Sequence, residues 1–517
     1  MTGFDRPSFG GGNAARTPDS AAAMTEAVAH LRAGRRPEAV AICEQVLARE
    51  PDHPDALHML GGMALQEGNC ERAVALIGRA AELDPGRAAR FLDLAAAQSG
   101  LGDLEAAAES FERVLALQPD HLLSLDSLGQ IRQRRGDFAA AAECYRRALA
   151  VEPGRASLHK GLGESLRALG QADAAAESYR RALAIEPDDK PVLLQLGFLE
   201  RGRGRLAEAL DCFRRAVALD PKDGATFNLI GIVHAERGEV EAAGTAYRQA
   251  IALRPDLVGA HANLARLHIA EGEAAAALDA AEAALRIDPC LSGPLGDKGL
   301  ALHELDRTAE SEALFDYDRF VRTRRLAPPQ GYQDMSAFNA VLAEAVRHHP
   351  TLVPETETLA TRGGMQTREI FDGSEPIDSL KRLISTAVDD YIAALPFDPA
   401  HPFTAKRQPG YRMTGWGVVL GNRGHQEAHM HDSAWISGVY YVALPPAVAE
   451  ALDDRSGWLE FGRCNDIFKL AKPPRIHAVR PEEGLLVLFP SFCWHGTVPF
   501  ESSASRISIA FDVFGSL

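Results

Sequence analysis

One residue type returns at a fixed interval along most of this chain. Eight prolines lie 34 residues apart, at Pro51, Pro85, Pro119, Pro153, Pro187, Pro221, Pro255 and Pro289. A period this strict indicates a solenoid of repeated helix pairs, because each unit of such a fold stacks on its neighbours. The end of the period also separates residues from about 330 to 517 as a different kind of domain.

Other residue types follow the same period. A small residue lies twelve positions before each proline, a large apolar residue follows most of these by four, and glycine marks a turn. Small residues let antiparallel helices approach closely, and proline ends the second helix because it lacks an N–H. The small column is Ala39, Ala73, Ala107, Ala141, Ala175, Ala209, Ala243 and Ala277; the large one is Ile77, Phe111, Tyr145, Tyr179, Phe213 and Tyr247; the turn glycines are Gly68, Gly102, Gly136, Gly170, Gly204, Gly238 and Gly272.

This pattern resembles the tetratricopeptide repeat (TPR) family over roughly residues 20–323, as nine units. A further column of Gly or Ala lies twelve residues before the alanine column, and Gly197 belongs to it. The ninth unit keeps Gly299 in this column and also keeps Phe315, but it has Ser311 in the alanine column and no closing proline, which indicates a cap or a junction. The resemblance implies an all-α superhelix whose inner groove binds a protein or peptide; a spacer or a dimerisation arm is the alternative. Positions expected to line the groove are mixed: His58, Asp126, Lys160, Leu194, Asn228 and Asn263.

Composition narrows the partners and the location. The formal net charge of −16 argues against a nucleic-acid or anionic-membrane binder, because phosphate contact needs clustered Lys and Arg. No apolar run approaches the ~18 residues of a membrane span. The seven cysteines form no CxxC pair, which favours a reducing cytoplasm. Residues 1–19 are rich in Gly, Ser and Pro without an apolar core, so we expect a disordered lead-in. The oligomeric state stays open.

The last third of the chain changes pattern. After a linker at 324–333, residues 334–349 and 377–394 have the apolar spacing of amphipathic helices. From about residue 410 the chain consists of short β-type runs separated by Gly, Pro and Asn. Helices followed by an all-β core predict a small barrel or jelly roll with flanking helices at 334–517.

Histidines gather in this β-rich part. His429 and His431 are two residues apart, so on a strand both imidazoles point to one face. A third imidazole from a distant strand, His495, makes a facial metal site possible. Arg506 and Ser508 likewise share a strand face. A buried cation beside a hydroxyl needs a carboxylate partner, which could come from a dicarboxylic cosubstrate.

The segment carries, in this order, an HxH pair, SGVYY and a late FPS…H…RIS motif. With these motifs it resembles a bacterial branch of the 2-oxoglutarate/Fe(II)-dependent dioxygenases, over about 190 residues. The resemblance implies a double-stranded β-helix that uses Fe(II) and 2-oxoglutarate. Carried over, His429 is the first iron ligand and His495 the distal one, and Arg506, helped by Ser508, binds 2-oxoglutarate. Gly457–Phe461 and residues 481–491 match the strands that flank the site.

The chain departs from the family at one ligand, because His431 stands where the pattern has a carboxylate. Three arrangements remain open. Iron is held by His429, His431 and His495, which we favour because imidazole is a competent Fe(II) ligand. Alternatively, Asp432 supplies the carboxylate, although it should face away on a regular strand. The third arrangement is the HxE pair His425 and Glu427.

Aromatic residues near these motifs are candidates for the pocket. Trp416, Tyr440 and Tyr441 lie in the β-type runs, and ordinary core packing is the alternative for each of them.

The leading functional hypothesis is a 2-oxoglutarate- and Fe(II)-dependent hydroxylase whose repeats recruit a protein or peptide. The alternative is a non-catalytic repeat scaffold with a degenerate oxygenase-like domain. A cupin-like metal enzyme without 2-oxoglutarate is disfavoured, since it has no need for Arg506 and Ser508.

Overall fold

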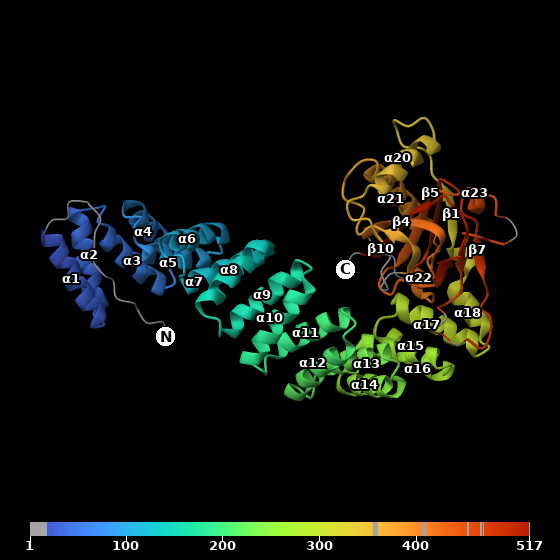
Figure 1. The fold of residues 1–517 in the computed structure, drawn as a ribbon, viewed down its shortest axis with the longest axis horizontal. Coiled ribbons are helices and arrows are strands. Elements are labelled where there is room, and N and C mark those ends of the chain that lie inside the picture. The colour runs from blue at the N-terminus through green and yellow to red at the C-terminus, as the bar shows by residue number, and fades with distance from the viewer. Residues whose placement is uncertain are drawn as a thin grey trace. The chain divides into compact units, whose positions relative to one another are not determined.

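The computed structural model describes residues 18–354, 360–405, 410–451, 454–465, 468 and 470–515. The chain forms two compact units, residues 1–221 and 222–517 (Figure 1). Most of the expected lead-in, residues 1–17, lies outside the described residues, and the first helix already includes Pro18 and Asp19.

The first unit consists of antiparallel helix pairs, as the period predicted (Figure 1). In the pairs from α3/α4 to α11/α12 the first helix is the shorter one, and in every pair the second helix ends before the column proline; in α12, for example, Leu219 is the last residue and Pro221 lies two positions later. The helices are α1 (Pro18–Arg32), α2 (Arg36–Arg49), α3 (Pro54–Gln66), α4 (Cys70–Leu83), α5 (Ala88–Gly100), α6 (Leu104–Leu117), α7 (Leu122–Arg134), α8 (Phe138–Val151), α9 (Ala156–Ala168), α10 (Ala172–Ile185), α11 (Lys190–Gly202) and α12 (Leu206–Leu219).

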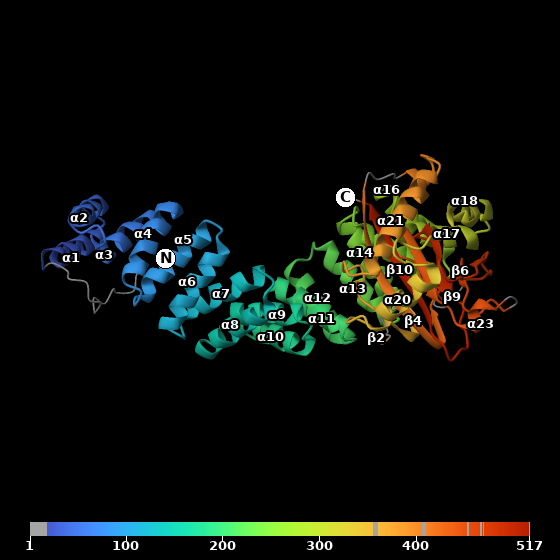
Figure 2. The same ribbon diagram turned by 90° about the horizontal axis from the view of Figure 1, so that it is seen from above.

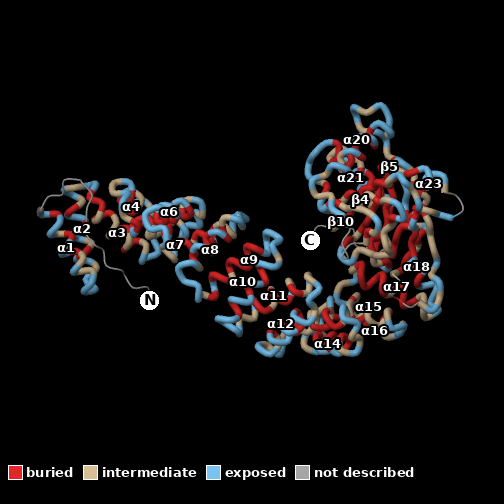
Figure 3. The backbone as a smooth tube through the Cα atoms, viewed as in Figure 1, coloured by how far each residue is buried: buried red, intermediate tan, exposed pale blue. Residues whose placement is uncertain are grey.

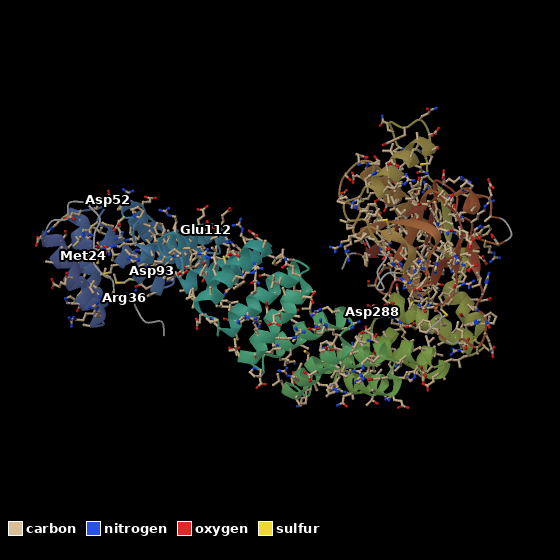
Figure 4. All side chains as sticks on the ribbon, viewed as in Figure 1. Met24, Arg36, Asp52, Asp93, Glu112 and Asp288 are labelled. Carbon is tan, nitrogen blue, oxygen red and sulfur yellow. The ribbon has the colours of Figure 1, made fainter. Side chains whose placement is uncertain are left out.

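The column residues hold each pair together. Phe213 of α12 is fully buried, and it lies so close to Gly197 of α11 that an added Cβ there would be 2.5 Å from its Cε1. Gly204 has φ +70°, the left-handed conformation that a turn between two helices favours and that glycine adopts without strain. Polar pairs join neighbouring first helices, as where His58 Nε2 lies 2.8 Å from Oδ2 of Asp93, which is labelled in Figure 4.

The second unit begins with the remaining repeat helices. These are α13 (Gly224–Glu236), α14 (Val240–Leu253), α15 (Val258–Ala270), α16 (Ala274–Ile287), α17 (Ser292–Glu304) and α18 (Thr308–Phe315), followed by the short α19 (Tyr317–Phe320). They belong to the same compact unit as the β domain. The carboxylate of Glu304 at the end of α17, for example, accepts hydrogen bonds from the backbone N–H groups of Ala471 and Lys472.

The β domain consists of two antiparallel sheets (Figure 2). The seven-stranded sheet has the order β1-β8-β5-β10-β4-β3-β2, and the three-stranded sheet has the order β7-β6-β9. Phe461 of β6 meets Phe489 of β8 edge-on at 4.9 Å between ring centroids, so the sheets face each other across a buried interior (Figure 3). The strands are β1 (Arg322–Arg325), β2 (Val353–Pro354), β3 (Thr361–Gln366), β4 (Tyr411–Gln426), β5 (Ile436–Ala443), β6 (Leu459–Phe461), β7 (His477–Val479), β8 (Leu485–Pro490), β9 (His495–Thr497) and β10 (Arg506–Gly515).

Helices flank the larger sheet. Asn339 of α20 (Met335–Arg347) accepts a hydrogen bond from Tyr440 of β5, and apolar residues of α21 (Ile377–Ala394) join the same buried cluster as β8. The short helices α22 (Pro402–Ala405) and α23 (Pro446–Ala449) lie in connections. These elements confirm the predicted fold class, a repeat solenoid followed by a β domain of the double-stranded β-helix type with flanking helices.

The structure revises the expected junction. Residues 322–325, assigned to the end of the repeats and the start of a linker at 324–333, form β1 and pair with β8 from Arg322↔Leu488 to Arg325↔Leu485. The sheet therefore takes its edge strand from the segment just after the last repeat. None of the described helices combines the length and the apolar character needed to span a membrane, and none of the seven cysteines, all of them described, forms a disulfide.

A matched pair of substitutions in α11 tests the packing of Gly197 against Phe213. Gly197→Ala should lower the free energy of unfolding by about 1–3 kcal/mol, because the new methyl group overlaps the Phe213 ring. Gly202→Ala, in the same helix with no atom within 4 Å of an added Cβ, should instead stabilise by about 0.4–1 kcal/mol. Urea unfolding of the full chain followed by circular dichroism measures both, and equal effects would contradict this account of the column.

Candidate metal centre

Three histidines meet where the segment between β4 and β5 runs beside the segment that leads from β8 into β9. His429 and His495 exchange two backbone hydrogen bonds of 2.9 Å each, and the N–H of His431 donates to the carbonyl of Ser491 at 3.1 Å. The ring centroids lie 4.4 Å (429–495), 5.1 Å (429–431) and 5.2 Å (431–495) apart. One nitrogen of each ring lies within 4.8 Å of the others, so a single ion can contact all three.

The hydrogen bonds of the rings orient them for ligation. His429 Nδ1 lies 2.7 Å from the Glu427 carbonyl and His495 Nδ1 lies 2.9 Å from the Cys493 carbonyl. His431 Nδ1 lies 2.6 Å from a carboxylate oxygen of Asp512. An Nδ1 that donates its proton leaves Nε2 with a lone pair, which is the form that binds metals.

One observation of the unliganded rings tests the fit to a metal. His431 Nε2 is buried and has no hydrogen-bond partner among the described residues. A buried polar atom normally has a partner, so this nitrogen is placed for a ligand. Burial, with His431 nearby, lowers the pKa of His429 to about 4, and burial likewise lowers the pKa of His495 well below its usual value. Both rings therefore stay neutral at neutral pH, as metal ligation requires.

The alternative carboxylates point elsewhere. Both oxygens of Asp432 contact the guanidinium of Arg266, at 2.9 and 3.2 Å. Glu427 makes a two-pronged pair with Arg362, at 2.8 and 3.0 Å. His425 lies outside the histidine cluster, with its Nδ1 3.2 Å from the Arg423 carbonyl. The structure thus brings together the three-histidine set and neither of the other two arrangements.

Arg506 and Ser508 lie on the inner face of β10. Arg506 is 2% exposed, and its Nε and Nη1 have no hydrogen-bond partner among the residues that the structure describes. Its guanidinium carbon lies 5.1 Å from the centre of the Tyr441 ring, and burial lowers its pKa. Ser508 is buried opposite Tyr441 in the strand register. A buried guanidinium with free donors fits the carboxylate of a ligand.

The structure places the candidate pocket residues on different faces of the larger sheet. The Trp416 indole stacks on His431, with 5.7 Å between centroids and 17° between planes, and Tyr441 lies beside Arg506. Tyr440 corrects the expectation: its hydroxyl donates to Asn339 of α20 at 2.6 Å, on the other face of the sheet. Neighbouring residues of a strand point to opposite faces, so Tyr440 and Tyr441 cannot both line the site.

Sequence reasoning missed Asp512, the acceptor for His431. It lies on β10 at an even spacing from Arg506 and Ser508 and is 7% exposed. The signal was available, because an aspartate inside the apolar run RISIAFDVF, in step with two site residues, belongs to the same face.

The last repeat contacts the segment that carries His429 and His431. The hydroxyl of Ser292 donates to the Ala434 carbonyl at 2.5 Å, and the N–H of Gly293 donates to the Asp432 carbonyl at 3.3 Å. Arg266 of α15 joins Asp432 to the fully buried Asp297 of α17, 3.6 Å away. Burial, partly opposed by Arg266, raises the pKa of Asp297 to about 7.

Comparisons with known families agree with both parts of the chain. The family described as "Putative 2OG-Fe(II) oxygenase" matches residues 414–512. Two tetratricopeptide repeat models match residues 24–88, 127–190, 194–258 and 231–289, and residues 90–121. The chain therefore carries tetratricopeptide repeats followed by a 2OG-Fe(II) oxygenase domain with a histidine triad, and that family implies Fe(II) and 2-oxoglutarate.

Solved structures are similar over the repeats. YrrB, a TPR protein with an unusual peptide-binding site, is 24% identical and covers 36% of this chain and 95% of its own, with a TM-score of 0.33. The C-terminal part of a TPR protein from Cytophaga hutchinsonii is 15% identical and covers 46% of this chain and 98% of its own, with a TM-score of 0.41. PilF of Pseudomonas aeruginosa is 20% identical and covers 40% of this chain and 94% of its own, with a TM-score of 0.32. TM-scores this low support no functional conclusion. A search of curated proteins found no match.

Two neighbouring substitutions distinguish the ligand sets. His431→Ala should abolish stoichiometric Fe(II) binding, because it removes one of three converging nitrogens. Asp432→Ala should leave binding within a few-fold of the unaltered protein, since its carboxylate is held by Arg266. Anaerobic Fe(II) titration with a chromophoric chelator as competitor measures both, and loss in Asp432→Ala with retention in His431→Ala would make Asp432 the ligand.

Proposed function

We propose that this chain is a 2-oxoglutarate- and Fe(II)-dependent hydroxylase that acts on a protein or peptide segment recruited by its repeats. The observation that carries the proposal is that one buried interior holds both a cluster of three histidines and an arginine with unpaired nitrogens. Three histidine nitrogens converge on one point, and Arg506 presents free donors on the inner face of β10, the strand that also carries Asp512. The first group suits a metal ion and the second suits a carboxylate.

The three histidines would hold Fe(II) from one side. His429, His431 and His495 approach from two segments, and an ion held by only these three protein ligands would keep coordination positions for cosubstrate and oxygen. When bound, Fe(II) and 2-oxoglutarate supply the oxidation: O₂ is consumed, 2-oxoglutarate becomes succinate and CO₂, and one oxygen atom enters the substrate as a hydroxyl group.

Arg506 would bind the far carboxylate of 2-oxoglutarate. An unpaired guanidinium costs several kcal/mol in an apolar interior, so a carboxylate that reaches it is bound strongly. Ser508, one step along the same face, adds a hydroxyl donor to that carboxylate. The Tyr441 ring, against which the guanidinium lies, keeps it in place.

Aromatic rings would keep water from the histidines. Phe489 meets the His495 ring edge-on at 4.6 Å, Phe461 lies 6.2 Å from the same ring, and Trp416 covers His431. A site with little water strengthens the electrostatic interactions inside it and limits side reactions.

The repeats of the second unit would bring the substrate. Asn228 of α13 and Asn263 of α15 are half-buried first-helix residues, and their amides hydrogen-bond to each other at 3.0 Å. Amide groups donate and accept, so they can bind the backbone of an extended segment. Three residues beyond Asn263, Arg266 contacts Asp432 beside His431. A segment bound by these asparagines would therefore lie close to His431. We place the protein in a reducing cytoplasm, since none of its seven cysteines, all of them described, forms a disulfide.

Cosubstrate binding gives the first test. Anaerobic addition of Fe(II) and then 2-oxoglutarate should produce the visible charge-transfer band of chelated iron. Arg506→Ala should lose this band at cosubstrate concentrations that saturate the unaltered protein while retaining iron, because its guanidinium is the buried partner of the carboxylate. Arg412→Ala, which removes an exposed arginine of the same sheet, should keep the band.

A different result would redirect the assignment. No band and no bound iron in the unaltered protein would favour a repeat scaffold without catalysis. A full band in Arg506→Ala would show that 2-oxoglutarate binds elsewhere.

Substrate recruitment gives a second test. Incubation of a cellular peptide library with Fe(II), 2-oxoglutarate and O₂ should yield peptides that gain one oxygen atom by mass spectrometry. The double variant Asn228→Ala/Asn263→Ala should raise KM for such a peptide about tenfold or more, from loss of hydrogen bonds worth about 1 kcal/mol each. The charge-transfer band should be unchanged. Oxidation of free small molecules only, with peptides untouched, would contradict a peptide substrate.

A further inference from the structure

A carboxylate lies directly behind one of the three histidines. Asp512 Oδ2 lies 2.6 Å from His431 Nδ1, and its Oδ1 accepts a hydrogen bond of 2.6 Å from the hydroxyl of Ser437. The Ser437 hydroxyl lies 2.8 Å from that of Ser491, whose backbone carbonyl in turn accepts from the N–H of His431. These four residues form a closed ring of hydrogen bonds.

The ring joins three separate parts of the β domain. Asp512 lies on β10, Ser437 lies on β5 directly opposite it, and Ser491 follows the last residue of β8. Ser437 and Ser491 are 1% and 0% exposed. A buried, fully engaged carboxylate of this kind has little freedom to move, so the position of the His431 ring is fixed by the sheet itself.

His431 differs from the other two histidines in its partner. His429 and His495 each have a backbone carbonyl at Nδ1, whereas His431 has a carboxylate. His431 is also the residue that stands where the family pattern has a carboxylate ligand. A carboxylate behind a metal-bound imidazole fixes its tautomer and makes it a stronger electron donor.

We propose that Asp512 is a positioning residue whose negative charge makes His431 a stronger electron donor to the metal, in place of the carboxylate ligand that the site lacks. This inference rests on the proposed metal site. The site then has one carboxylate near its ion, as the family pattern has. Here, however, the His431 imidazole lies between that carboxylate and the metal. On this reading the HxH sequence is a working variant of the site and does not mark a degenerate one.

The test is metal affinity measured apart from catalysis. Co(II), whose visible d–d bands report coordination, is titrated anaerobically into the full-length chain. Asp512→Asn keeps an oxygen that can accept from His431 but removes the charge, so the dissociation constant for Co(II) should rise about 10- to 100-fold, with shifted bands. Asp432→Asn is the matched control: it removes a charge from the residue next to His431 that faces Arg266 instead, and its constant should stay within a few-fold.

A purely structural role for Asp512 predicts another result. Asp512→Asn would then change the melting temperature of the metal-free protein but leave the Co(II) constant and bands as in the unaltered protein, and this would overturn the proposal. If Asp512→Asn does not fold, Ser437→Ala, which removes one hydrogen bond from the carboxylate, should still weaken Co(II) binding several-fold; an unchanged constant there would also overturn it. Failure of the unaltered protein to bind Co(II) would instead reject the metal site.

Discussion

The antiparallel pairing of β10 with β4 and β5 is the constraint on which the site depends. Arg506, Ser508 and Asp512 occupy alternate positions of this central strand, so all three side chains leave the same face. A shift of the register by one residue would turn them toward the helices that cover the outer face, where Tyr440 lies. The apolar residues between them, such as Ile507 and Ile509, are fully buried on that outer face and oppose such a shift.

Several buried polar atoms of this interior have no hydrogen-bond partner among the described residues, and they include His431 Nε2, two nitrogens of Arg506 and the Tyr441 hydroxyl. Each ring Nδ1 of the three histidines has an acceptor, whereas the Nε2 of His431 has none among the described residues. Arg506 likewise keeps two donors free in a buried position. Folding alone would not select such groups, because each costs free energy unless a ligand completes it. The places where partners are lacking therefore indicate what the site binds.

The last repeat has two kinds of small residue with different uses. Gly299 keeps the column role and accommodates the Phe315 ring, whereas Ser292, Gly293 and Gly296 admit the backbone and side chains of the segment that holds His429 and His431. The departure of this unit from the repeat pattern is thus explained by the β domain against which it packs. Under the proposed function, this contact would bring a segment bound by the repeats close to the three histidines.

Local periodicity made much of this protein predictable from its sequence. The interval of 34 residues determined the helix pairs, and spacing by two determined that Arg506 and Ser508 share a face of β10, because these relations involve only neighbours along the chain. His429 and His431 lie beyond the end of β4, so their approach to each other depends on the tertiary structure instead. The site roles carried over from the family resemblance stay predictions until they are measured, although the three histidines do meet.

Only the tertiary structure decided which distant groups pair. Asp432 is adjacent to His431, yet it is held by Arg266, 166 residues earlier, while Asp512, 81 residues away in sequence, reaches the His431 ring. The edge strand β1 likewise pairs with β8, although more than half of the β domain's sequence separates the two strands. Such pairings depend on which elements meet in space, and sequence spacing does not encode that.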